Sequence, residues 1–304
     1  MAKVLALLMS GRARGFTASL LERAAEGARS VDGVEVEWVH VQRHKFGPCT
    51  SCFNCIRDSD EHACTLRDAM GKDGALMAKV EEANGIIIGD PVHTWGPTAT
   101  CHLFVERCYP HLWTGKLVGM PFASISCASN QGMQRLAREN LCKWSFTMGF
   151  RYMGGLPVHT TQLARARGEA EDLGRQVGQA ALEDAVERRP FADQEKFVAY
   201  LDQPWSALEP YLENLSNGTM SWDGSLLAEG VESFESDEAR DLLTEARGHF
   251  EAALRLRGAG QREESCAELV RASALWTHAT WKEFLEEDVI RSAKPEAYRP
   301  IPES

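Results

Sequence analysis

Short apolar runs alternate with longer amphipathic segments along the chain as far as about residue 188. This alternation is typical of βα units and predicts a parallel sheet covered by helices. The expected strands span residues 3–9, 34–41, 85–89, 121–127 and 152–158, and the expected helices span residues 17–29, 67–83, 97–108, 134–147 and 168–189. The run at 3–9 is apolar throughout, as in strands buried on both faces. We therefore expect an α/β fold, a three-layer sandwich with a five-stranded parallel sheet.

The strand order decides which loops meet. In the flavodoxin-like order 2-1-3-4-5, the loops after the first three strands leave the carboxyl edge of neighbouring strands, on either side of the switch point. These loops carry the sequences SGRARGFT, GPCTSCFNC and DPVHTWGP. The order therefore predicts that three separate sequence signals lie on one rim of the sheet and form one site.

The second of these loops carries four cysteines within sixteen residues, Cys49, Cys52, Cys55 and Cys64. The spacing Cys-x2-Cys-x2-Cys-x8-Cys lets four thiolates converge on one iron-sulfur cluster. Zinc also accepts four thiolates in tetrahedral geometry. A loop of four reduced thiols without metal is the third interpretation. The spacing favours the cluster but does not by itself separate the three.

The first loop, residues 10–17, is suited to a monophosphate. Its hydroxyls, an arginine and the amide groups of the following helix N-terminus can all point at one phosphate. The loop matches neither GxxxxGK[ST] nor GxGxxG, which disfavours ATP and dinucleotide folds. A Ser/Gly/Thr turn before a helix is also compatible with a plain capped loop.

Three segments together resemble the NADPH-dependent FMN reductase-like flavoproteins, and among them the iron-sulfur flavoproteins, over roughly residues 1–160. MSGRARGFT is similar to the family pattern GSPRxxGNT. PCTSCFNC followed by CTLRDAM is similar to PCxxCxxC followed by CxxxDDM. GIIIGDPVHTWGPTATCHLFVER is similar to GIIxGSPVYxxxxxAxxKxFxDR, without a gap between Pro91 and Arg107.

The resemblance implies FMN, with its phosphate at Ser10, Arg12 and Thr17 and its ring against the loop that starts at Pro91. It also implies a [4Fe-4S] cluster held by the four cysteines, and NAD(P)H as a possible co-substrate. The residues expected to bind FMN are Ser10, Arg12, Arg14, Gly15, Phe16, Thr17, Pro91, Val92, His93, Thr94, Trp95, Gly96, Ser129 and Asn130.

The chain departs from the family pattern at Phe16, where asparagine is usual, at His93, where tyrosine is usual, and at Trp95, where a small residue is usual. The last cysteine gap is also longer. His93 and Trp95 are our candidate catalytic residues. An imidazole beside a flavin can protonate a substrate near neutral pH, or it can simply hold the loop by a hydrogen bond. The indole can narrow the pocket or stack on the substrate, or it can serve packing alone.

The character of the chain changes after residue 189, and we divide it into a flavin domain at 1–189 and a helical extension at 190–304. Amphipathic segments at 236–256 and 261–290 predict an antiparallel helical hairpin, broken by three residues at 258–260. The tail at 294–304 is expected to be extended.

A lone hairpin buries little apolar surface, so we expect it to pack on the flavin domain or on another subunit of a homo-oligomer, a dimer or tetramer. Trp276, His278 and Trp281 are candidate lid residues, or part of a core stripe.

Composition narrows the class of partner. There are 44 acidic against 33 basic residues, and a net charge of −11 argues against a nucleic-acid partner. Nine cysteines, a short N-terminal apolar run and the lack of an apolar stretch near 20 residues predict a cytoplasmic protein with no membrane segment. The five cysteines outside the motif have no mutual ligand spacing and are expected in the core.

These signals predict an FMN-dependent oxidoreductase that passes electrons through a cluster and FMN to a small-molecule acceptor. A ferredoxin-type protein is a possible electron donor. Two alternatives remain open. One is a cluster-free NAD(P)H-dependent reductase of FMN or quinones, and the other is a non-enzymatic electron-transfer protein whose partner is another protein.

Overall fold

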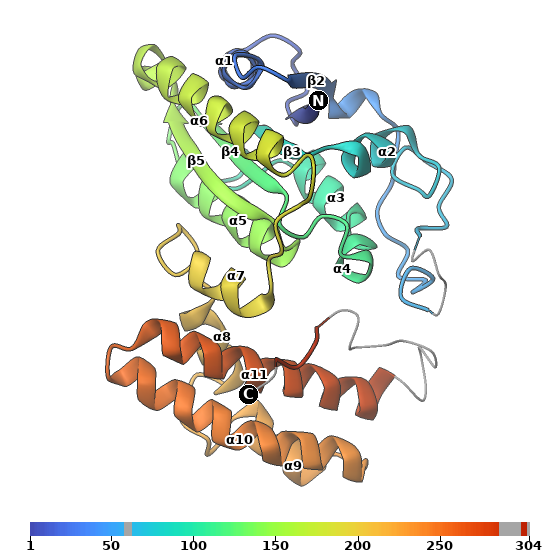
Figure 1. Ribbon diagram of the computed structural model, residues 1–304, viewed down its shortest axis with the longest axis vertical. Helices are drawn as coiled ribbons and strands as arrows, with labels where there is room; N and C mark the ends of the chain where they lie inside the picture. The colour runs from blue at the N-terminus through green and yellow to red at the C-terminus, as the bar shows by residue number, and fades with distance from the viewer. Residues whose placement is uncertain (58–62, 286–298, 303–304) are drawn as a thin grey trace. The chain divides into compact units, whose positions relative to one another are not determined.

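The computed structural model describes residues 1–57, 63–285 and 299–302 (Figure 1). The chain divides into two compact units. The first comprises Met1–Cys52 and Ala63–Phe191, and the second comprises Phe53–His62 and Ala192–Ser304. The division into a flavin domain at 1–189 and a helical extension at 190–304 remains a prediction. Across the described residues, no helix has both the length and the apolar character that a membrane span requires.

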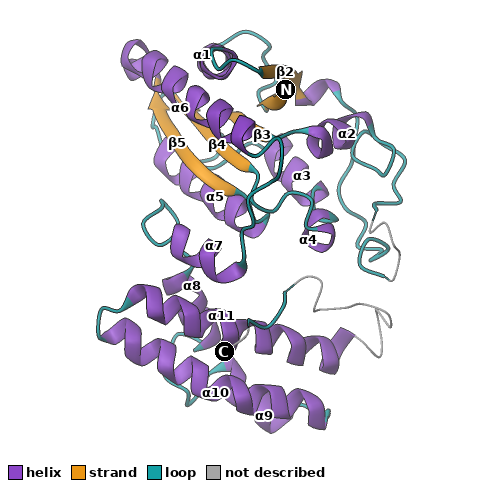
Figure 2. Cartoon of the chain, viewed as in Figure 1, coloured by secondary structure: helices purple, strands orange, loops and turns teal. Residues whose placement is uncertain are grey.

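The first unit contains a five-stranded sheet of order β2-β1-β3-β4-β5 in which all paired strands are parallel. Its strands are β1 (Ala2–Leu8), β2 (Val34–His40), β3 (Gly85–Pro91), β4 (Pro121–Ala128) and β5 (Arg151–His159). Its helices are α1 (Phe16–Arg29), α2 (Ala75–Glu82), α3 (Ala99–Arg107), α4 (His111–Thr114), α5 (Gln134–Thr147) and α6 (Leu163–Glu183) (Figure 2). The predicted α/β class and flavodoxin-like strand order are therefore confirmed.

The sheet is covered on both faces, which explains the unbroken apolar runs of its central strands. All eight residues of β4 are buried. Alternate residues of β1 pack with α1 and α6 in one core, which includes Ala2, Val4, Ala6, Leu8, Leu20, Leu21, Ala24, Leu173, Val177 and Ala181. Figure 1 shows α1 and α6 on one side of the sheet and α3 and α5 on the other. The carboxyl ends of β1, β3 and β4 thus open on one edge.

Helices α1 and α6 meet through small residues. A Cβ atom added at Gly27 would overlap the Glu171 carbonyl oxygen, and one added at Gly174 would overlap the Ala24 carbonyl oxygen. Glycine permits backbones to approach this closely because it has no side chain. The close contact fixes the position of α1, whose first turn borders the site described below.

We expect Gly174→Ala to lower the free energy of unfolding of the first unit by about 1–3 kcal/mol, the usual cost of overpacking. Gly168→Ala is the matched control, because Gly168 lies exposed in the same helix with open space around its Cα. That control should be neutral or gain about 0.5–1 kcal/mol from the better helix propensity of alanine. Thermal unfolding followed by circular dichroism measures both. Equal stabilities of the two variants would contradict the close helix contact.

Two predicted helices of this unit have the wrong bounds, and α4 was not predicted. The helix expected at 67–83 begins only at Ala75, because Gly71 and Gly74 turn the preceding segment tightly against its own backbone. The helix expected at 168–189 is α6, which starts five residues earlier at Leu163 and ends at Glu183. Beyond its end, Arg188 donates to the carbonyl oxygens of Lys116 and Ala83, so this stretch follows tertiary contacts.

The second unit is helical, with α7 (Asp193–Ala199), α8 (Leu208–Leu215), α9 (Leu226–Ser233), α10 (Asp237–Gly258) and α11 (Arg262–Thr280). The predicted hairpin corresponds to α10 and α11, and Ser236 caps α10 by accepting the Ala239 N–H at 3.2 Å. Helices α7, α8 and α9 were not predicted, since each is only seven or eight residues long. A π-helical turn, Trp281–Leu285, continues α11. The rest of the predicted helix to residue 290, and most of the tail, lies outside the described residues.

Candidate functional site

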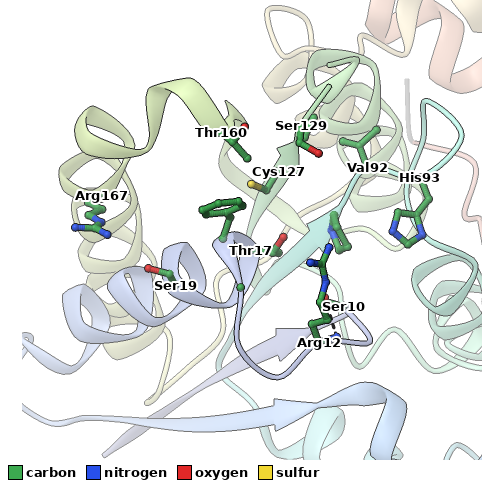
Figure 3. A pocket seen from close by; sticks show the side chains of 14 residues that line it. Ser10, Arg12, Thr17, Ser19, Val92, His93, Cys127, Ser129, Thr160 and Arg167 are labelled. Atoms are coloured by element: carbon green, nitrogen blue, oxygen red, sulfur yellow. Dashed lines mark hydrogen bonds between the residues drawn. The ribbon is translucent and has the colours of Figure 1, made fainter. Parts of the chain in front are cut away.

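A cavity of about 610 Å³ opens at the carboxyl edge of the sheet (Figure 3). This volume is in the range of small-molecule and cofactor sites. Its lining comes from the loop after β1 and the start of α1, from the end of β3, from the end of β4, and from the segment around the start of α6. The lining residues are Ser10, Arg12, Gly15, Phe16, Thr17, Ser19, Pro91, Val92, His93, Cys127, Ala128, Ser129, Thr160 and Arg167.

One end of the cavity is the N-terminus of α1. Gly15 precedes the helix, and none of the described side chains makes a capping hydrogen bond there. The first N–H groups of a helix need partners, and a phosphate supplies them. Arg12 and Thr17 flank this helix start, and the Arg12 N–H donates to the Ser10 hydroxyl at 3.1 Å. The donors therefore fit a monophosphate.

His40 supports this loop from β2. Its Nε2 lies 2.7 Å from the Ser10 carbonyl oxygen. This contact could not be predicted from local pattern, because His40 is one more position in an alternating strand. The contact fixes the backbone where the chain leaves β1 and turns toward α1.

The loop at 91–96 forms a tight turn at another side of the cavity. His93 and Gly96 exchange both backbone hydrogen bonds, at 2.9 and 3.0 Å. Between them, Thr94 and Trp95 have φ of 49° and 64°. Left-handed backbone costs about 1–3 kcal/mol for each non-glycine residue, and it is seldom adopted by a β-branched side chain. Trp95 stands at the tip with 55% of its surface exposed.

Asp90 holds the base of this turn. Its carboxylate accepts the Thr98 N–H at 2.9 Å and the Thr98 hydroxyl at 2.6 Å. The Thr98 hydroxyl in turn caps α3 by accepting the Cys101 N–H at 3.2 Å. Burial raises the pKa of Asp90 to about 7, against the lowering effect of the two bonds from Thr98. The two hydrogen bonds between Asp90 and Thr98 fix both ends of the strained turn. The Asp90 carboxyl group titrates near neutral pH.

We expect a carbon-13 NMR titration to show one aspartate carboxyl with a midpoint near pH 7, absent from Asp90→Asn. Between its ordinary value of 3.8 and about 7, the folded protein keeps a proton that the unfolded chain releases. The free energy of unfolding therefore falls as pH rises through this window, and the total decrease is about 4 kcal/mol. Asp90→Asn should lack this decline. A midpoint near pH 4 would contradict the buried-carboxyl assignment.

Nine of the fourteen residues predicted to bind cofactor line the cavity, so the predicted meeting of the first and third loops is present in the structure. Those that do not line it are Arg14, Thr94, Trp95, Gly96 and Asn130. Of the two candidate catalytic residues, His93 faces the cavity in Figure 3, whereas Trp95 lies at the exposed tip of the turn. The roles of all these residues remain predictions.

Five lining residues are not among the fourteen predicted to bind cofactor: Ser19, Cys127, Ala128, Thr160 and Arg167. Cys127 and Ala128 end β4, so their place at the carboxyl edge was a usable signal. The five cysteines outside the motif are buried as predicted, and Cys127 is both buried and part of the cavity wall. Burial raises the pKa of the Cys127 thiol, and a hydrogen bond with Thr17 partly offsets this.

The two ends of the cysteine loop (residues 47–68) lie at the last residue of α3, at the opposite end of this helix from the 91–96 loop, because Arg107 contacts Gly47 and Asp68. Cys49 and Cys52 are exposed, whereas Cys55 and Cys64 are half-buried. Cys49, Cys52 and Cys64 belong to the first unit and Cys55 to the second. Among the described residues, no three potential ligands are gathered into one metal-holding group. The structure therefore presents the donors without an assembled metal centre.

The chemistry of these donors nevertheless fits a thiolate-ligated cluster. The Ser51 N–H donates to the Cys49 sulfur at 3.4 Å, and Arg107 Nη2 donates to the Cys64 sulfur at 3.4 Å. Hydrogen bonds to the sulfurs are a regular feature of cluster sites. Ser51 and Phe53 have positive φ, of 50° and 57°. Left-handed residues of this kind turn successive N–H groups toward an anionic group.

A doubly wound parallel sheet of this order, with a cavity at its carboxyl edge, defines a flavodoxin-like fold. The family model described as NADPH-dependent FMN reductase matches residues 2–161, and the chain belongs to this family. The predicted resemblance is thus confirmed, and membership supports the prediction of an FMN-dependent oxidoreductase.

Individual relatives are more distant. The chain is 32% identical over 108 residues to an iron-sulfur flavoprotein of Methanocaldococcus jannaschii, covering 36% of this chain and 52% of that protein. It thus spans about half the length of this curated relative. Among solved structures, it is similar to a WrbA-like flavodoxin protein of Agrobacterium tumefaciens, with a TM-score of 0.41, 16% identity and coverage of 60% and 99% of the two chains. It is also similar to an NADH:FMN oxidoreductase, with a TM-score of 0.42, 17% identity and coverage of 60% and 90%.

Proposed function

We propose that this protein is an FMN-dependent oxidoreductase in which the four cysteines bind a [4Fe-4S] cluster and a small molecule accepts electrons at the cavity. The observation that carries the proposal is the cavity itself, which combines an uncapped helix N-terminus with a polar loop rim. The cluster part is supported by the cysteine spacing and by the likeness to an iron-sulfur flavoprotein.

Different residues of the cavity would bind different parts of FMN. Arg12, Thr17 and the first N–H groups of α1 would hold the FMN phosphate, because charge-assisted hydrogen bonds are the strong class. Pro91 and Val92 supply an apolar wall on the side of β3 and exclude water from it. The reciprocal backbone bonds of His93 keep its imidazole at the cavity edge.

FMN, when bound, supplies redox chemistry that exchanges electrons singly or in pairs. The chain's own contribution to such a reaction is a proton at a defined atom. His93 faces the cavity and can give a proton from an imidazole nitrogen to the acceptor, since imidazole is a common general acid in enzymes. Asp90 acts indirectly, because its hydrogen bonds to Thr98 hold the turn that carries His93.

A second candidate is a cluster-free reductase that takes hydride from NAD(P)H. It is supported by the family's description. A non-enzymatic electron-transfer protein is the third. A ferredoxin-type donor, a homo-oligomeric state, a cytoplasmic location and the lid role of the C-terminal hairpin remain predictions.

One experiment separates the cluster-containing protein from the cluster-free reductase. The full chain is purified without oxygen, its ultraviolet-visible spectrum is recorded, and iron, sulfide and extracted flavin are measured. We expect FMN together with iron and sulfide. FMN without iron, and with rapid reduction by NADPH, would favour the cluster-free reductase. FAD, or no flavin after reconstitution, would overturn the proposal.

A further inference from the structure

The buried guanidinium of Arg107 joins three parts of the cysteine loop. Arg107 is the last residue of α3 and only 2% exposed. Its Nη1 donates to the Gly47 carbonyl oxygen at 2.7 Å, where the chain enters the loop. Nη1 and Nη2 donate to the two Asp68 carboxylate oxygens at 2.6 and 2.9 Å, where the chain leaves it. Nη2 also donates to the Cys64 sulfur at 3.4 Å. One side chain therefore ties both ends of the loop to a cysteine.

Neighbouring contacts close the same loop. Glu106, the residue before Arg107, accepts the Cys49 N–H at 3.0 Å. The Ala69 N–H donates to the Lys45 carbonyl oxygen at 3.1 Å, so entry and exit segments are paired directly. The last two residues of α3 thus contact the first and the last cysteine of the motif.

The opposite end of α3 is held at the cavity. Thr98 caps the helix and is itself bound by Asp90, next to the 91–96 loop. The nine residues of α3 span about 14 Å at 1.5 Å per residue. A single short, capped helix therefore sets the separation between the cysteine loop and the rim of the cavity.

We propose that Arg107 is a positioning residue for the iron-sulfur cluster, which it serves by fixing Cys64 and donating a hydrogen bond to its sulfur. This inference rests on the proposed function. A cation that donates to a ligand sulfur stabilises the more negative, reduced cluster and raises its reduction potential. Asp68 has the opposite charge at the same place, so its carboxylate lowers that potential.

Two full-length variants, reconstituted anaerobically with iron and sulfide, test this role. Arg107→Lys keeps the positive charge but replaces the planar fork by one compact ammonium group, which cannot reproduce the bidentate pair with Asp68. We expect its iron retention against a chelator to fall about 10- to 100-fold and its midpoint potential to become more negative. Asp68→Asn loosens the same loop but removes a negative charge, so its midpoint should become more positive.

Opposite shifts of the two midpoint potentials would distinguish a positioning role of Arg107 from a general loosening of the loop. General loosening would shift both midpoint potentials in one direction. Wild-type iron retention and midpoint in Arg107→Lys would overturn the inference and leave the proposed function standing. Wild-type protein that binds no iron would overturn both. Circular dichroism and FMN binding check the fold. If Arg107→Lys does not fold, Asp68→Asn decides: a more positive midpoint supports the inference, and an unchanged or more negative one overturns it.

Discussion

The double variant Arg12→Ala/Thr17→Ala is expected to bind FMN at least about 100-fold more weakly than the wild type. Hydrogen bonds to a charged group contribute about 1.5–3 kcal/mol each, and two such contacts give about 3–6 kcal/mol, or roughly 100- to 10,000-fold in affinity. Arg12 is exposed and therefore screened by salt, which favours the lower end. Fluorescence quenching of FMN titrated into the apoprotein measures the change.

Arg14→Ala is the matched control for charge. Arg14 lies on the same loop and is exposed, but it does not line the cavity. Its removal should change FMN affinity only slightly. If the double variant retains FMN as well as Arg14→Ala does, the phosphate does not lie at the N-terminus of α1.

Replacement of Cys52 or Cys64 by serine is expected to abolish most of the iron and sulfide in anaerobically prepared protein. Loss of one thiolate leaves a cluster with an incomplete ligand set. FMN content should remain at the wild-type level, because neither cysteine lines the cavity. Iron and sulfide analysis, together with the visible spectrum, gives the result.

Cys142→Ala controls for the loss of any cysteine. Cys142 is buried in α5 and outside the motif, so its replacement should leave iron unchanged. Full iron content in both serine variants would mean that other residues bind the metal. Zinc in place of iron in the wild type would identify the loop as a structural zinc site instead.

The strands could be predicted because each is a separate apolar run, and the βα rhythm indicates a parallel sheet, whereas the order 2-1-3-4-5 was taken from the flavodoxin-like class. That order predicted that the first and third loops lie at the same edge of the sheet. In the structure, Thr17 and His93 from these loops line one cavity. Arg167 was missed for a local reason. The start of α6 was placed at Gly168, five residues too late, so Arg167 was not counted as part of a helix near the cavity.

Contacts between distant residues could not be predicted from local pattern. The segment before α2 has an amphipathic sequence, but Asp68 in it accepts bonds from Arg107, 39 residues away. Burial alone would raise the pKa of Asp68, whereas the bonds from Arg107 and from the Gly47 and Met70 N–H groups lower it. Similarly, Asp90 was expected only as the first residue of the loop after the strand at 85–89, and its bonds to Thr98 required the folded chain.

Because the start of α1 is uncapped, we expect the supply of FMN to change the stability of the folded chain. The start of α1 has no side-chain cap near Gly15 among the described residues, so a bound anion would replace water as the partner of its first N–H groups. A ligand that binds the folded state alone adds about 2.7 kcal/mol to stability at a concentration one hundred times its dissociation constant. The lifetime of this protein against proteases should therefore rise with the concentration of free FMN, so that flavin availability would control how much of the chain persists.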